Sequence, residues 1–111
     1  MLTPVPIVNF FLRIEALLKL PGLSTLERCA VIDRRNDVSR LLKASKGRLA
    51  DVFRTDLQAD PVSRPTVDEA IASNKTADAL GAFLRTLEWI AKLEHRHIPG
   101  LEKRHLPGED I

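Results

Sequence analysis

The histidines near residue 95 are the first side chains of this sequence whose types could do chemistry. Glu94, His95 and His97 all carry groups that bind metal ions. Residues two positions apart on a helix point to nearly opposite sides, so His95 and His97 do not chelate one ion together. We therefore expect no metal site and no cofactor here.

A pair of aspartates, four residues apart, is the second candidate. Asp33 and Asp37 lie on one helical face, as paired carboxylates of an acid–base site would. Arg34 and Arg40 stand among them, which is the pattern of a solvated, charged surface. The sequence also contains no glycine-rich phosphate loop and no nucleophile elbow. We predict no catalytic residue and no small-molecule substrate.

Two consecutive arginines are the third candidate. Arg34 and Arg35 occupy positions where the apolar stripe of their helix is due. If the chain folds back about residue 61 or 62, Arg35 lies against Glu88 and Arg34 lies beside Trp89. We predict an inter-helix polar pairing of these four residues, with a guanidinium stacked on the indole.

The same residues support one alternative function. Helical bundles of the chorismate-mutase type bind a small dicarboxylate between arginines, and Arg34, Arg35 and Glu88 could line such a pocket. A small helical enzyme of this type is therefore an alternative hypothesis. It predicts a closed pocket in which several arginines converge.

A basic helix face supports another alternative. Arg40, Lys43 and Lys46 belong to the most basic part of the chain, where a nucleic-acid backbone could be bound. Aspartates are interspersed among these residues, and no short recognition helix with a tight turn is discernible. A nucleic-acid-binding regulator is thus the alternative to a protein-binding one.

Hydrophobic periodicity predicts three helices that position these groups. Ser24 with Glu27, and Thr66 with Glu69, form capping-box patterns at two helix starts. Prolines at 61 and 65 mark the loop between the two long helices. A break at Gly47 would give four helices. The predicted helices run from Pro4 or Pro6 to about Leu20, from Ser24 to Leu57 and from Thr66 to His97.

These helices predict an all-α fold, a three-helix bundle built on a long antiparallel αα-hairpin. The first helix spans roughly 24 Å, whereas each long helix spans nearly 50 Å, at about 1.5 Å per residue. The first helix therefore leaves the loop end of the hairpin open. The apolar side chains expected to stay partly exposed there, as an interface for a partner or a second copy, are Leu49, Val52, Phe53, Leu57, Val67 and Ile71.

Length and composition predict one helical domain over residues 1–97 and a poorly ordered tail over 98–111. The chain has 111 residues, of which 44% are hydrophobic and 29% charged, and its formal net charge is +2. A single cysteine fits a cytoplasmic setting. In the tail, Arg96 to Gly100 recurs as Arg104 to Gly108 with leucine for isoleucine, either as a pair of turns or as a short peptide for a partner.

Taken together, the sequence predicts a cytoplasmic, non-catalytic protein-interaction module. We expect it to bind another protein or itself, as a homodimer, through an apolar helix face. An adaptor, a chaperone or an antiactivator that antagonises a regulatory protein would act in this way. No membrane association is expected, because no apolar segment is long enough to span one.

Overall fold

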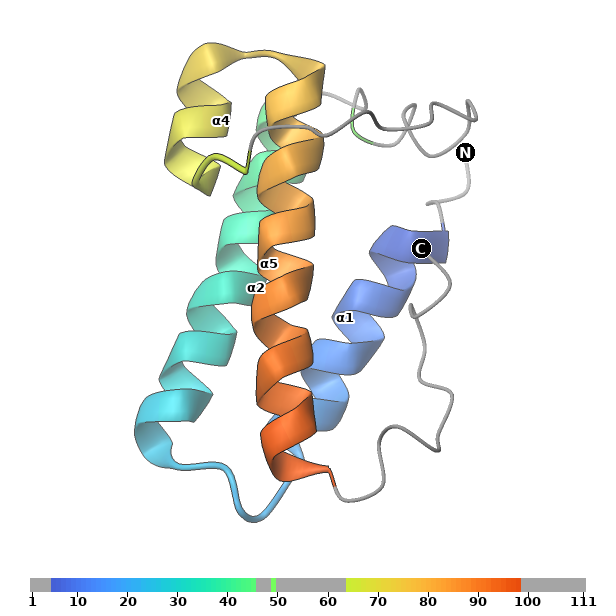
Figure 1. The fold of residues 1–111 in the computed structure, drawn as a ribbon, viewed down its shortest axis with the longest axis vertical. Coiled ribbons are helices and arrows are strands. Elements are labelled where there is room, and N and C mark those ends of the chain that lie inside the picture. The colour runs from blue at the N-terminus through green and yellow to red at the C-terminus, as the bar shows by residue number, and fades with distance from the viewer. Residues whose placement is uncertain (1–4, 46–48, 50–63, 99–111) are drawn as a thin grey trace.

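A computed structural model describes residues 5–45, 49 and 64–98, and these residues form an all-α bundle (Figure 1). This confirms the predicted fold class. The described helices are α1 (Val5–Leu18), α2 (Thr25–Ser45), α4 (Val67–Ser73) and α5 (Thr76–His97). Residues 99–111, which make up most of the predicted tail, lie outside the described residues.

The first helix packs through its phenylalanine side. Ile7, Phe10 and Ile14 are fully buried, and the ring centroids of Phe10 and Phe83 lie 5.7 Å apart. The last turn of α1 is closed by Arg28, whose guanidinium donates to the carbonyls of Leu18 and Leu20. Carbonyls at a helix end have no partner within the helix, so this contact stabilises the turn into α2.

The second helix begins with the predicted capping box. Ser24 N–H donates to Glu27 Oε1 and Glu27 N–H donates to Ser24 Oγ, each at 3.1 Å. The described part of α2 ends at Ser45. Continuity through Gly47 lies outside the described residues, and so does most of the loop of the predicted hairpin. Leu49 is helical and buried.

The prediction of one helix from Thr66 to His97 is wrong, because Asn74 divides it. Asn74 has φ 57° and ψ 26°, a left-handed conformation that ends α4, and its N–H bonds to the carbonyl of Ala70. Asparagine adopts this conformation more readily than other residues with a Cβ atom. Lys75 is then extended and α5 begins at Thr76. The predicted cap at the start of α4 is formed, since Thr66 Oγ1 accepts from Glu69 N–H at 3.2 Å.

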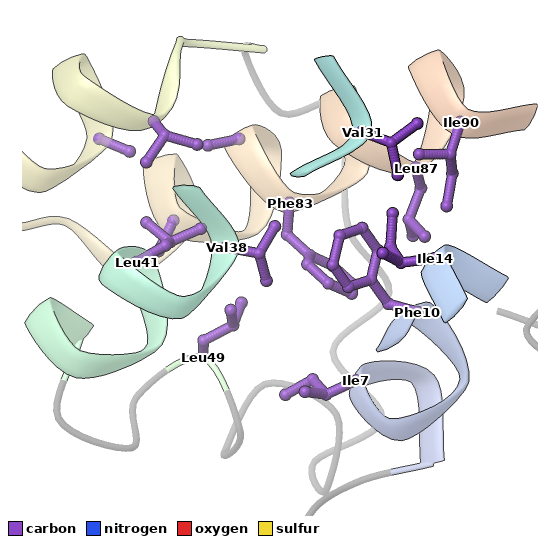
Figure 2. Packing of buried hydrophobic residues seen from close by; sticks show 14 of the residues in the cluster. Ile7, Phe10, Ile14, Val31, Val38, Leu41, Leu49, Phe83, Leu87 and Ile90 are labelled. Atoms are coloured by element: carbon purple, nitrogen blue, oxygen red, sulfur yellow. The ribbon is translucent and has the colours of Figure 1, made fainter. Parts of the chain in front are cut away.

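The division lets α4 fold back onto the end of the bundle. In Figure 1, α2 and α5 run antiparallel, α1 packs along one side of them, and α4 lies against their upper end. Val67 and Ala70 of α4 are buried in the same core as residues of α1, α2 and α5. Figure 2 shows how Phe10, Val38 and Phe83 of those three helices meet in this core. The end of the bundle that was expected to stay open is therefore covered by α4.

A buried ion pair joins α1 to α5. Arg13 Nε donates to Glu94 Oε2 at 3.0 Å and its Nη2 contacts Glu94 Oε1, so the contact is bidentate. The two side chains are only 7% and 3% exposed. Arg13 therefore lies on the packing face of α1, although a charged residue of an amphipathic helix ordinarily faces the solvent. The pair fixes the position of α1 on the α2–α5 pair.

Candidate binding groove

A cavity lies between α2, α5 and the segment that leads into α4. Its volume is about 470 Å³, within the range of ligand pockets. Most of its walls are charged. They include Arg34 and Asp37 of α2, Arg64 before α4, and three residues of α5, namely Arg85, Glu88 and Lys92.

A second, apolar hollow of about 250 Å³ lies nearer the start of α2. Leu26 and Ala30 of α2 line it together with Trp89 and Leu93 of α5. Trp89 lines both hollows, and we call the two together the Trp89 groove. It runs along the α2–α5 pair from the start of α4 to the far end of the bundle.

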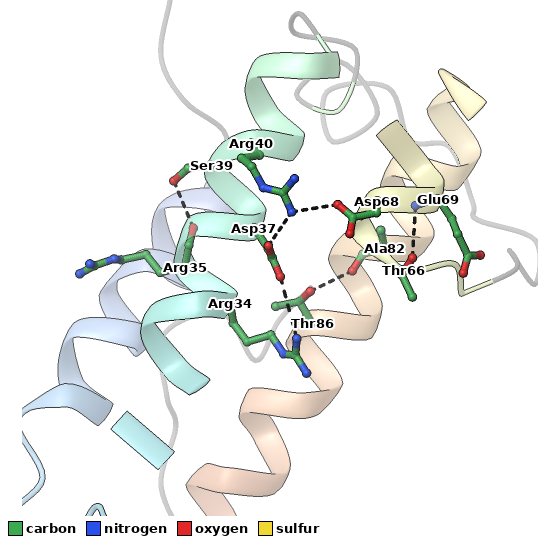
Figure 3. A network of polar contacts seen from close by, with 10 residues as sticks. All are labelled: Arg34, Arg35, Asp37, Ser39, Arg40, Thr66, Asp68, Glu69, Ala82 and Thr86. Carbon is green, nitrogen blue, oxygen red and sulfur yellow. Dashed lines mark hydrogen bonds and ion pairs between the residues drawn. The ribbon is translucent and has the colours of Figure 1, made fainter. Parts of the chain in front are cut away.

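Arg34 and Trp89 meet in the middle of this groove, as predicted. The guanidinium carbon of Arg34 lies 5.0 Å from the centroid of the indole, a cation–π distance. Arg34 Nη1 is also 3.9 Å from a carboxylate oxygen of Asp37 (Figure 3). These contacts hold the guanidinium over the ring.

The other half of the predicted pairing is wrong. Glu88 pairs with Arg64, at 3.3 Å, and not with Arg35. Figure 3 shows the Arg35 side chain directed away from α5. Neighbouring residues of a helix point about 100° apart, so once Arg34 faces Trp89, Arg35 faces elsewhere.

The groove carries a surplus of positive charge. Five basic residues line its two hollows against three acidic ones, Glu27, Asp37 and Glu88. Each of these three carboxylates already has a basic partner. The Arg85 guanidinium, by contrast, donates to a backbone carbonyl, that of Arg64, at 2.8 Å. Arg85 and Lys92 form no ion pair with any residue in the described ranges.

The far end of the groove is closed by a cluster around Glu27. Its carboxylate lies 2.8 Å from His97 Nε2 and 3.3 Å from Arg96 Nη1, which ties the start of α2 to the end of α5. The hydrogen bond with His97 and that from the Ser24 N–H lower the pKa of Glu27 to about 2. The carboxylate is therefore ionised across the physiological pH range.

Arg40, from the basic face considered for nucleic acid, is engaged within the protein. Its guanidinium bridges Asp37 at 2.7 Å and Asp68 at 3.0 Å, and these hydrogen bonds raise its pKa (Figure 3). The bridge links α2 to α4. Lys43 is exposed and Lys46 lies outside the described residues. With two carboxylates beside it, Arg40 offers less positive charge to a phosphate backbone than predicted.

The predicted loop-end interface is not an exposed patch in the part that is described. Leu49 and Val67 are buried, and Ile71 is half-buried against the core. That prediction is wrong for Leu49 and Val67, since α4 packs against the bundle instead of extending α5, whereas Ile71 is partly exposed as predicted. The remaining three, Val52, Phe53 and Leu57, lie outside the described residues.

Large apolar side chains are exposed elsewhere. Leu26, at the start of α2, is 82% exposed and forms the rim of the Trp89 groove. On α1, Val5, Val8 and Leu12 are exposed along one face. The sequence analysis predicted neither of these exposed sites. It also did not predict the groove, although Arg85, Trp89 and Lys92 are spaced by four and three residues and so share one face of a helix.

In the described ranges, no three metal-binding side chains cluster, and no helix is both long and apolar enough to cross a membrane. Comparison with known proteins adds no relative. Neither a protein-family model, nor a curated protein, nor a solved structure matches this chain.

Proposed function

We propose that the protein is a non-catalytic protein-binding module that receives a helix of its partner in the Trp89 groove. The observation that carries the proposal is Leu26, which is 82% exposed beside the apolar hollow formed with Trp89 and Leu93. An exposed leucine next to an unfilled apolar hollow is typical of a contact that another chain completes.

The shape of the bundle supports a helix as the occupant. Two antiparallel helices leave a groove between them that a further helix fills by ridge-into-groove packing. At the upper end α4 occupies this position, but it is only seven residues long. In the rest of the groove, toward Leu26, a helix of the partner could pack between α2 and α5 in the same way. Trp89 and Arg34 at its centre are of the residue types that dominate binding energy at interfaces.

Adaptors, chaperones and antiactivators of regulatory proteins all act by such binding. The proposal keeps the mode of action predicted from the sequence and moves the binding surface from the loop end to the α2–α5 face. The protein would work in the cytoplasm, and a second copy of the chain is the alternative occupant of the groove.

A matched pair of variants tests this function. We expect Leu26→Glu to abolish capture of the partner in affinity purification with mass spectrometry, because it places a charge in the apolar hollow. Leu12→Glu on α1 makes the same change at another exposed leucine and should leave capture unchanged. If Leu12→Glu abolishes capture and Leu26→Glu does not, the interface lies on α1 and the proposed groove is refuted. Light scattering of the purified protein identifies a second copy as the occupant.

One observation favours a second candidate function. Arg34, Arg64 and Arg85 all line the 470 Å³ cavity, as a pocket for a small dicarboxylate would require. Arg35, which the enzyme hypothesis had placed there, points elsewhere. An assay for chorismate mutase activity tests this candidate directly, and Arg85→Gln should reduce any turnover that is found.

A further inference from the structure

We infer that the partner of the Trp89 groove is an acidic amphipathic helix, with two carboxylates about seven residues apart and an apolar side chain between them. This inference rests on the proposed function and names the chemistry of the partner. It follows from the order of charged and apolar residues along α5.

The α5 wall of the groove places an apolar residue between basic ones. Arg85, Trp89, Lys92 and Arg96 recur at intervals of four, three and four residues, so they line one face of the helix. Arg85 and Lys92 are separated by about 10.5 Å along the axis. A helix lying alongside α5 presents side chains at the same interval, one above the other, every seven residues.

The first and third positions of this pattern are cations without a carboxylate partner in the described part of the chain. Among the described residues, Arg85 and Lys92 have no ion-pair partner, while Arg34, Arg64 and Arg96 each have one. The Arg85 guanidinium is also held in place by the carbonyl of Arg64. A carboxylate that reaches it finds a donor already oriented, which lowers the entropic cost of binding.

Other occupants fit these residues less well. A nucleic-acid backbone would meet the carboxylates of Glu27, Asp37 and Glu88 and would leave the hollow at Leu26 unfilled. A second copy docking through the exposed apolar face of α1 brings one carboxylate, Glu15, which is the only acidic residue of that helix. The groove offers two cations that have no ion-pair partner within residues 5–45, 49 and 64–98, and it therefore favours a more acidic helix.

A displayed library of random 18-residue peptides provides the probe. We expect the wild-type protein to enrich peptides with an excess of Asp and Glu around a large apolar residue. Their affinity should fall at least about fivefold between 0.05 and 0.5 M NaCl, because each exposed ion pair contributes a factor of about two to five.

Charge reversal provides the decisive comparison. Selection on the double variant Arg85→Glu/Lys92→Glu should lose the acidic excess. The control, Lys19→Glu/Lys43→Glu, changes the net charge equally at exposed positions outside the groove and should retain it. Thermal unfolding of each variant establishes that it is folded.

The outcomes separate the inference from the function on which it rests. If the enriched peptides show no acidic excess, or if both double variants select alike, the inference is overturned. If the enriched peptides bind Leu26→Glu as tightly as wild type, the groove itself is refuted. Failure of the wild-type protein to enrich any peptide would count against both. Enrichment of this chain's own sequences would replace the acidic partner with a second copy.

Discussion

Arg13 and Glu94 show how far a single residue can depart from the pattern of its helix. A charged residue in an amphipathic helix is ordinarily assigned to the solvent, yet both of these side chains are buried. Each side chain is the hydrogen-bonding and ionic partner of the other, although they are 81 residues apart in the sequence. A pairing at that separation has no local signal, so the sequence could predict the apolar face of α1 but not this contact.

Removing one partner of this ion pair should destabilise the fold more than replacing both partners with apolar residues. We expect Glu94→Leu to lower the free energy of unfolding by about 3 to 5 kcal/mol, because it leaves a buried guanidinium unpaired. The double variant Arg13→Met/Glu94→Leu should recover to within about 1 kcal/mol of wild type. Urea denaturation measures both. As a control, Arg40→Gln breaks an exposed contact and should cost less than about 1 kcal/mol. A double variant no more stable than the single one would contradict this account.

Glu27 should make stability depend on pH in the acid range. Its pKa in the folded protein is about 2, below the ordinary value of 4.5, so the folded state binds fewer protons than the unfolded state between these values. Its stabilising contribution is therefore complete above pH 4.5 and is lost as the pH falls toward 2.

Chemical denaturation at several pH values checks this prediction. Wild type should exceed Glu27→Gln in stability above pH 4.5, and the difference should shrink as the pH falls from 4.5 to 2. In an NMR titration, His97→Ala should raise the pKa of Glu27, because the His97 hydrogen bond is the largest cause of its depression. A difference that stays constant with pH would show that the contact is not formed in solution.

At the scale of the elements, the predictions succeeded where the signal was local. The capping box at Ser24 and the cap at Thr66 are formed as the sequence indicated, because the groups involved lie within three residues. The break at Asn74 escaped prediction. Asparagine costs only about 0.7 kcal/mol in a helix interior, too little to reject a continuous helix. Burial of Val67 and Ala70 against the bundle, which is tertiary, favours the break.

The turn at Asn74 predicts that glycine is more stable than alanine at position 74. In the helix two residues earlier, alanine should be more stable than glycine. Asn74→Ala should destabilise the protein by about 1 kcal/mol, because alanine tolerates φ 57° poorly, whereas Asn74→Gly should change stability by less than about 0.5 kcal/mol. Ala72→Gly, at an exposed helical position two residues earlier, should instead destabilise by about 1 kcal/mol. Thermal unfolding measures all three. A variant Asn74→Gly that is less stable than Asn74→Ala by about 1 kcal/mol would indicate a continuous helix.

At the scale of the whole molecule, α4 is the element whose stability depends most on its neighbours. A helix of seven residues is not stable alone, so α4 depends on its buried Val67 and Ala70 and on the bridge from Arg40 to Asp68. The sequence predicted an open bundle end because it assigned these residues to a longer helix. Their packing gives the groove its upper boundary.

Hydrogen exchange should reveal this dependence. We expect the amides of α4 to exchange faster than those in the middle of α5, and Val67→Ala to increase the difference by removing buried contacts. Exchange in α1 should stay unchanged in this variant and serves as the internal control. Equal protection of α4 and α5 would mean that α4 unfolds only with the entire bundle.

The position of Trp89 also gives the protein an optical reporter. The chain contains one tryptophan and no tyrosine, so ultraviolet emission comes almost entirely from the indole at the centre of the groove. A chain that settles over the indole excludes water from it, and the emission maximum then moves to shorter wavelength. Occupancy of the groove is thus readable in the unlabelled protein by titration in a fluorimeter.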